Sequence, residues 1–151
     1  RFLLLLDDII DSSAMRRGAT AKIDGLISRY RHIGNGEIEG KLTIAMATQY
    51  FKSISVIARN NATAYYIMGM LPEMELGKIS ESLSYFGGSS KAFLDIFYRS
   101  KKEAYDFLYL SVEHLEARRN HTDLLWKQGD NMYKSAEQLK AETEIKDNIM
   151  K

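Results

Sequence analysis

Residues 2–8 read Phe-Leu-Leu-Leu-Leu-Asp-Asp, an unbroken apolar run that ends in two adjacent carboxylates, and a third aspartate follows at position 11. Because residues 2–6 are apolar on every side until the acids begin, we interpret residues 2–12 as the end of a buried helix. On a helix, Asp7 and Asp11 lie four residues apart on one face, where like charges repel each other. Such a stretch is unfavourable as a scaffold and is typical of a binding site.

The composition bounds the class of protein. A chain of 151 residues with 45% hydrophobic and 27% charged residues is in the ordinary range for one globular domain. The net charge of +1 gives no general attraction for nucleic acid. No apolar run is long enough to span a membrane. The absence of cysteine fits a reducing compartment, so we expect a cytoplasmic protein. Because the chain opens on Arg1 inside an apolar run, we expect a fragment or truncated form.

The sequence predicts an all-α fold. It has one proline, and it is rich in Leu, Ala, Lys, Glu and Met, which favour helices. Apolar residues recur at three- to four-residue spacing along much of the chain. Together with residues 2–12, the predicted helices cover residues 22–32, 37–59, 62–70, 73–85, 91–119 and 122–150. We therefore expect a single all-helical domain over residues 1–151.

The aspartates are followed by Arg16 and Arg17, which suggests a site for a metal ion and a phosphate. Carboxylate oxygens are hard ligands that suit Mg²⁺, and this ion commonly bridges to substrate phosphates. Arginine supplies two parallel donors to the same phosphates. The alternative is a helix that ends in solvated acids, followed by a basic turn that pairs with them. Both interpretations stay open on the residues alone.

Residues 4–18, Leu-Leu-Leu-Asp-Asp-Ile-Ile-Asp-Ser-Ser-Ala-Met-Arg-Arg-Gly, resemble the first aspartate-rich motif of the trans-prenyl diphosphate synthases. That motif has two aliphatic residues, DDxxD, four residues and then RRG. The resemblance implies the all-α isoprenoid-synthase bundle, here partial. It also implies a catalytic group in which Asp7 and Asp11 hold Mg²⁺ and Asp8 supports them.

The same resemblance implies a reaction. Arg16 would bind an allylic diphosphate and Arg17 isopentenyl diphosphate, and the enzyme would condense the two. Phe2 lies five residues before Asp7, where the family measures product length, and an aromatic there implies a short-chain product. The other interpretation of Phe2 is a core aromatic.

The rest of the chain departs from the family pattern. Lys41 stands where the family has an aspartate, and only Asp95 is present near the expected second aspartate-rich motif. The sequence therefore predicts a chain that is inactive alone and works as a homo- or hetero-oligomer. The alternative function is a non-catalytic helical interaction protein or an accessory subunit.

Overall fold

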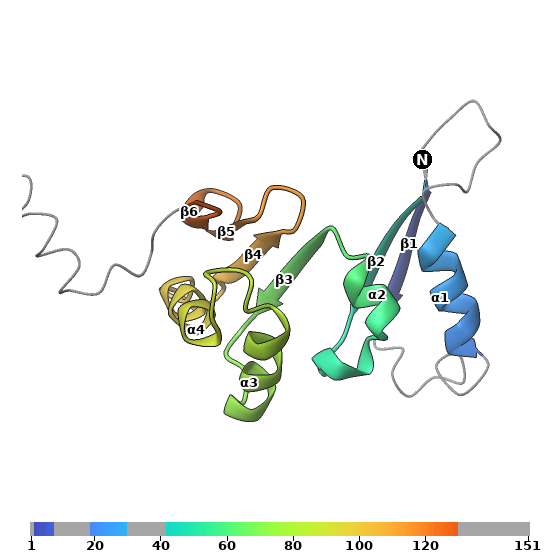
Figure 1. Ribbon diagram of the computed structural model, residues 1–151, viewed down its shortest axis with the longest axis horizontal. Coiled ribbons are helices and arrows are strands. Elements are labelled where there is room, and N and C mark those ends of the chain that lie inside the picture. The colour runs from blue at the N-terminus through green and yellow to red at the C-terminus, as the bar shows by residue number, and fades with distance from the viewer. Residues whose placement is uncertain (1, 8–18, 30–41, 130–151) are drawn as a thin grey trace, which may run out of the picture. The chain divides into compact units, whose positions relative to one another are not determined.

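The computed structural model describes residues 2–7, 19–29 and 42–129, which form helices and strands in two compact units (Figure 1). The first unit takes the described residues up to Thr63 together with 72–79, and the second takes the remainder. Four α-helices and six strands occur in these described ranges. The predicted all-α fold is therefore wrong, and the chain has a mixed α/β fold. No helix in the described ranges is long and apolar enough to cross a membrane.

The first unit is built on a parallel strand pair. Strand β1 (Phe2–Asp7) pairs with β2 (Leu42–Ala47) from Phe2 opposite Leu42 to Asp7 opposite Ala47. Parallel neighbours need a crossover connection, and helix α1 (Ala19–Arg29) lies in the segment between them. The chain continues through the short 3-10 helix η4 (Phe51–Ser53) and helix α2 (Val56–Asn60), which contacts α1. Buried apolar side chains in this unit come from several of these segments: Ile27, Phe51, Ala58, Leu76 and Ile79.

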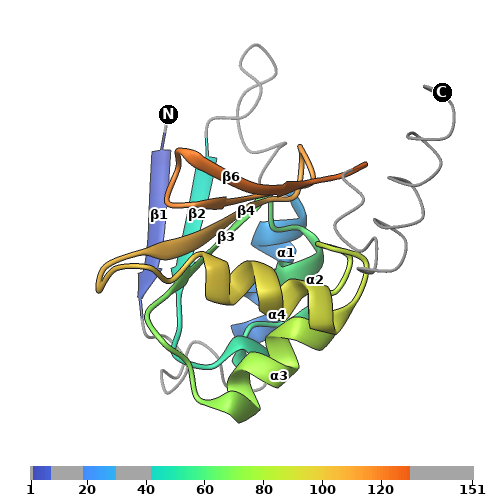
Figure 2. The same ribbon diagram turned by 90° about the vertical axis from the view of Figure 1, so that its left-hand side faces the viewer.

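The second unit is a four-stranded antiparallel sheet with a helix on one face. The strand order is β3 (Ala64–Met68), β4 (Phe107–Ser111), β5 (Glu116–Arg119) and β6 (Asp123–Lys127). Helix α4 (Ser90–Arg99) runs along one face of this sheet (Figure 2). The boundary between the units falls within helix α3 (Glu73–Ser82).

The core of the second unit joins the apolar side of α4 to the inner face of the sheet. Phe93, Ile96 and Phe97 of α4 are fully buried, as are Leu108 and Leu110 of β4. Alternate residues of a strand point to the same face, so the two leucines pack inward together. The loop before α4 requires glycine at position 87, where φ is +94° and an added Cβ would lie 2.8 Å from the Cβ of Ala92.

Several predicted helices are strands in the structure. Residues 2–7 form β1, residues 42–47 form β2 inside the predicted helix 37–59, and residues 64–68 form β3. The predicted helices 91–119 and 122–150 are interrupted in the same way by β4, β5 and β6. A short apolar run is compatible with a buried strand as well as with a helix, and chance three- to four-residue spacing does not separate the two. The helix predictions are confirmed for residues 22–29, 73–82 and 91–99.

Asp106 organises the loop that leads from α4 into the sheet. Its carboxylate accepts hydrogen bonds from the backbone N–H groups of Lys102 (3.1 Å) and Glu103 (2.9 Å) and from Asn120 Nδ2 (2.9 Å). The hydrogen bond from Asn120, followed by those from the backbone, holds the pKa of Asp106 below its usual value. The ionised carboxylate therefore joins this loop to the turn between β5 and β6.

We expect Phe97→Ala to lower the free energy of unfolding by about 3–5 kcal/mol, because it opens a cavity under α4. Urea denaturation followed by tryptophan fluorescence measures this, since Trp126 lies in the same unit. Tyr105, at 97% exposure, provides the control, and Tyr105→Ala should change stability by less than about 0.5 kcal/mol. Equal losses in the two variants would contradict the assignment of Phe97 to the core.

We expect Asp106→Asn to destabilise the fold at neutral pH. The gap in stability between the variant and wild type should become smaller as the pH falls. A carboxyl whose pKa is lowered by folding adds stability above its unfolded pKa, and that stability is lost as the pH falls through the folded pKa. Thermal melts of both proteins between pH 7 and about pH 2 measure the gap, because an unfolded aspartate titrates near pH 3.9. A gap that stays constant over this range would show that the charge of Asp106 is unimportant.

Candidate metal and phosphate site

Asp7 is the last residue of β1, and its side chain is exposed. It lies opposite Ala47, the last residue of β2, so both carboxyl ends meet at one edge of the parallel pair. In open α/β structures, ligands bind just beyond the carboxyl ends of parallel strands. The structure thus places Asp7 where a ligand site is expected, although it does so with a strand in place of the predicted helix.

Phe2 and Asp7 are farther apart than the helical interpretation required. Phe2 is the first residue of β1, and five residues of strand span about 17 Å, against about 7.5 Å of helix. The helical geometry assumed for a product-length role of Phe2 is therefore wrong. The other predicted site residues lie outside the described residues: Asp8, Asp11, Arg16 and Arg17.

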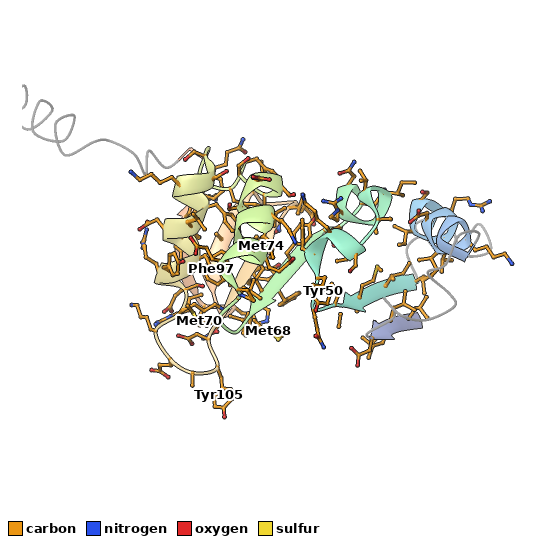
Figure 3. The ribbon with its side chains drawn as sticks, turned by 90° about the horizontal axis from the view of Figure 1, so that it is seen from below. Tyr50, Met68, Met70, Met74, Phe97 and Tyr105 are labelled. Carbon is orange, nitrogen blue, oxygen red and sulfur yellow. The ribbon has the colours of Figure 1, made fainter. Side chains whose placement is uncertain are left out.

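A hydrogen-bonded turn follows β2 directly. Thr48 Oγ1 accepts the Tyr50 N–H (3.1 Å) and lies 3.0 Å from Ser53 Oγ. The Ser53 N–H and hydroxyl both donate to the Tyr50 carbonyl. We call residues 48–53 the β2 turn. It presents the exposed side chains of Gln49 and Tyr50 beyond the strand end, and Tyr50 is labelled in Figure 3.

Charged groups surround Phe51, the buried aromatic of the β2 turn. The Arg59 guanidinium carbon lies 5.2 Å from the centre of its ring, within the range of a cation–π contact. The Glu75 carboxylate forms an ion pair with Lys78 and accepts the backbone N–H of Phe51. The hydrogen bond from Lys78 is the main cause that lowers the pKa of Glu75. These contacts hold the turn on the first unit.

The carboxylate at this edge is suited to magnesium rather than zinc. No three His, Asp or Glu side chains gather closely enough to hold a metal ion within residues 2–7, 19–29 and 42–129. Mg²⁺ does not need such a cluster, because it keeps several waters and uses one or two carboxylates together with substrate phosphates. Asp7 therefore fits one protein ligand of a phosphate-bridged Mg²⁺.

The second unit carries a separate aromatic cluster on the sheet face away from α4. The His121 ring lies 5.1–5.7 Å from the rings of Tyr66, Phe107 and Tyr109. Met68, Met70 and Tyr105 of the same unit are exposed, and all three are labelled in Figure 3. The described part of this unit has equal numbers of basic and acidic residues, so it has no net attraction for a polyanion.

Comparison of the chain with known protein families, with curated proteins and with solved structures finds no match. The sequence predicts a role for Asp7, because an acid after an apolar run is a local signal, and this role stays a prediction. Sequence reasoning missed Thr48 and Gln49, which were placed inside the predicted helix 37–59 and gain significance only as residues beyond a strand end.

We expect Thr48→Val to lower the free energy of unfolding by about 1 kcal/mol, because it removes the hydroxyl that binds the Tyr50 N–H and Ser53. Urea denaturation measures the change. Thr43→Val is the matched control, because Thr43 is an exposed threonine in the middle of β2 and valine favours strands. Equal stability of the two variants would show that the Thr48 hydroxyl does not hold the turn.

Proposed function

We propose that this chain carries the metal-binding side of a nucleoside triphosphate hydrolysis site, located at the carboxyl ends of β1 and β2. The observation that carries the proposal is the position of Asp7, at the end of an apolar strand in a parallel pair. In P-loop nucleoside triphosphatases a Walker-B aspartate holds the Mg²⁺ that bridges the β- and γ-phosphates. Asp7 has the ligand chemistry and the place in the fold that suit this role.

Gln49 is the second residue assigned to the site. It lies two residues after Ala47, the partner of Asp7 in the strand pair, and its side chain is exposed. A glutamine amide can donate a hydrogen bond to a phosphate oxygen and accept one from a water molecule. We assign Gln49 to the orientation of the terminal phosphate or of the attacking water.

This chain would supply only the metal-binding side of the site. The sequence contains no G-x-x-x-x-G-K-[ST] phosphate-binding loop. We therefore assign that loop to a segment or a second polypeptide outside these 151 residues, in keeping with the predicted oligomer. A cysteine-free chain that uses a nucleotide suits the cytoplasm, and we place the activity there.

The DDxxD and RRG residues of positions 7–18 favour a second candidate, an allylic diphosphate held for prenyl transfer. Both candidates require Mg²⁺ between Asp7 and a chain of phosphates, so one experiment with different phosphate ligands separates them. The all-α bundle that the prenyltransferase resemblance implies is not the fold of the described residues. A purely accessory role remains the third outcome.

We expect Mn²⁺, used as a paramagnetic substitute for Mg²⁺, to broaden the NMR signals of residues 4–7 and 47–50 when ATP is added to the chain. In Asp7→Asn, about tenfold more ATP or an even higher concentration should be needed for the same broadening, because loss of a metal contact lowers metal affinity by at least that factor. Asp95→Asn is the matched control, because Asp95 is an exposed aspartate of the second unit that forms an ion pair with Arg99.

The ligand series decides between the candidates. Broadening with ATP but not with geranyl diphosphate supports the nucleotide site. Broadening with geranyl diphosphate alone supports the prenyl diphosphate site. Broadening that is absent with both ligands, or that survives Asp7→Asn unchanged, would refute both and leave the accessory role.

A further inference from the structure

We infer that Asp24 and Ser55 are positioning residues, whose hydrogen bond holds the β2 turn in place beside Asp7. The functional meaning of this bond rests on the proposed function, whereas its effect on the turn does not. Asp24 lies on α1 and Ser55 is the N-cap of α2, so the bond joins the helices that follow the two strands of the site.

The Ser55 hydroxyl forms hydrogen bonds to both helices. It donates to Asp24 Oδ1 at 2.5 Å and accepts the Ala58 N–H at 3.0 Å. A hydroxyl has one proton to give, so the bond to Asp24 fixes the direction of its lone pairs. The cap of α2 is thereby oriented by a side chain that lies 31 positions earlier in the sequence.

The β2 turn is anchored on both sides by these contacts. Before the turn, Ala47 is paired with Asp7 in the parallel sheet. After the turn, Ile54 alone separates Ser53 from Ser55. A shift of Ser55 is therefore transmitted directly to the hydrogen bonds that close the turn, and through them to the exposed Gln49.

The environment strengthens the bond. Asp24 and Ser55 are both half-buried, so water competes less for the carboxylate than it does at a fully exposed position. The acceptor is a carboxylate, and hydrogen bonds to ionised groups are about twice as strong as neutral ones. Of the two hydrogen bonds that the Ser55 hydroxyl forms within the described ranges, the one to Asp24 is the only one with a charged partner.

The test removes the acceptor and then restores it. Asp24→Ala eliminates the bond while favouring the helical state of α1, because alanine is the best helix former. Asp24→Asn restores an acceptor oxygen without the charge. Ser28→Ala is the matched control on the same helix, since Ser28 Oγ donates to the Asp24 backbone carbonyl and not to its carboxylate.

We expect Asp24→Ala to speed hydrogen exchange of the Ser53 and Ile54 amides, which close the turn, by about fivefold or more. Asp24→Asn should recover most of the protection, and Ser28→Ala should leave it at the wild-type level. With Mn²⁺ and ATP, Asp24→Ala should also reduce broadening of the Gln49 side-chain amide, and Asp24→Asn should recover it.

The outcomes separate the inference from the proposed function. Exchange at Ser53 and Ile54 that is the same in Asp24→Ala and Ser28→Ala would overturn the inference, even if wild type binds ATP. Suppose that exchange is faster in Asp24→Ala but that Mn²⁺ and ATP broaden no signals in wild type. This result would support the positioning of the turn and refute the nucleotide site. If Asp24→Ala does not fold, Ser55→Ala against Ser55→Thr gives the same comparison, because threonine keeps the hydroxyl.

Discussion

The parallel pairing of β1 with β2 is the constraint on which the candidate site depends. Two parallel neighbours end at the same edge of a sheet, so the residues that follow them are brought together although they lie about forty positions apart in sequence. A connection with a helix is then required, and α1 provides it. This pairing places the carboxylate of Asp7 opposite Ala47, directly before the β2 turn.

The second unit is stabilised in a different way. Its sheet is antiparallel, and one face is covered by the aromatic side of α4, so apolar burial supplies most of the favourable free energy. Polar contacts act locally: the Asp106 carboxylate fixes a loop by accepting hydrogen bonds from backbone N–H groups. The opposite face carries the ring contacts of Tyr66, Phe107, Tyr109 and His121.

Local signals in the sequence are enough to predict part of this structure. Helix α4 has a serine cap at Ser89 and a strong apolar side, and both are visible within a dozen residues. Asp7 could be singled out as a candidate residue because its signal, an acid after an apolar run, does not depend on whether the preceding residues form a helix or a strand.

The remainder depends on contacts between segments that are distant in sequence. Nothing within residues 2–7 decides between strand and buried helix, because the strand state is stabilised by hydrogen bonds to residues 42–47. Residues 107–111 alternate between the two faces of the sheet, yet their apolar residues also fit helical spacing over a longer window. The bond between Asp24 and Ser55 has no signature at all in the sequence, since two ordinary polar residues gain a role only when the helices meet.

The alternation of side chains along β1 restricts how this segment can vary between related proteins. Leu3, Leu5 and Asp7 share the exposed face, and Leu4 and Leu6 point to the other. Exchange of one aliphatic residue for another keeps that assignment, but insertion or deletion of a single residue would reverse it and turn the carboxylate to the opposite face of the sheet. Natural variation in residues 3–6 should thus exchange one aliphatic residue for another and leave the number of residues before Asp7 unchanged.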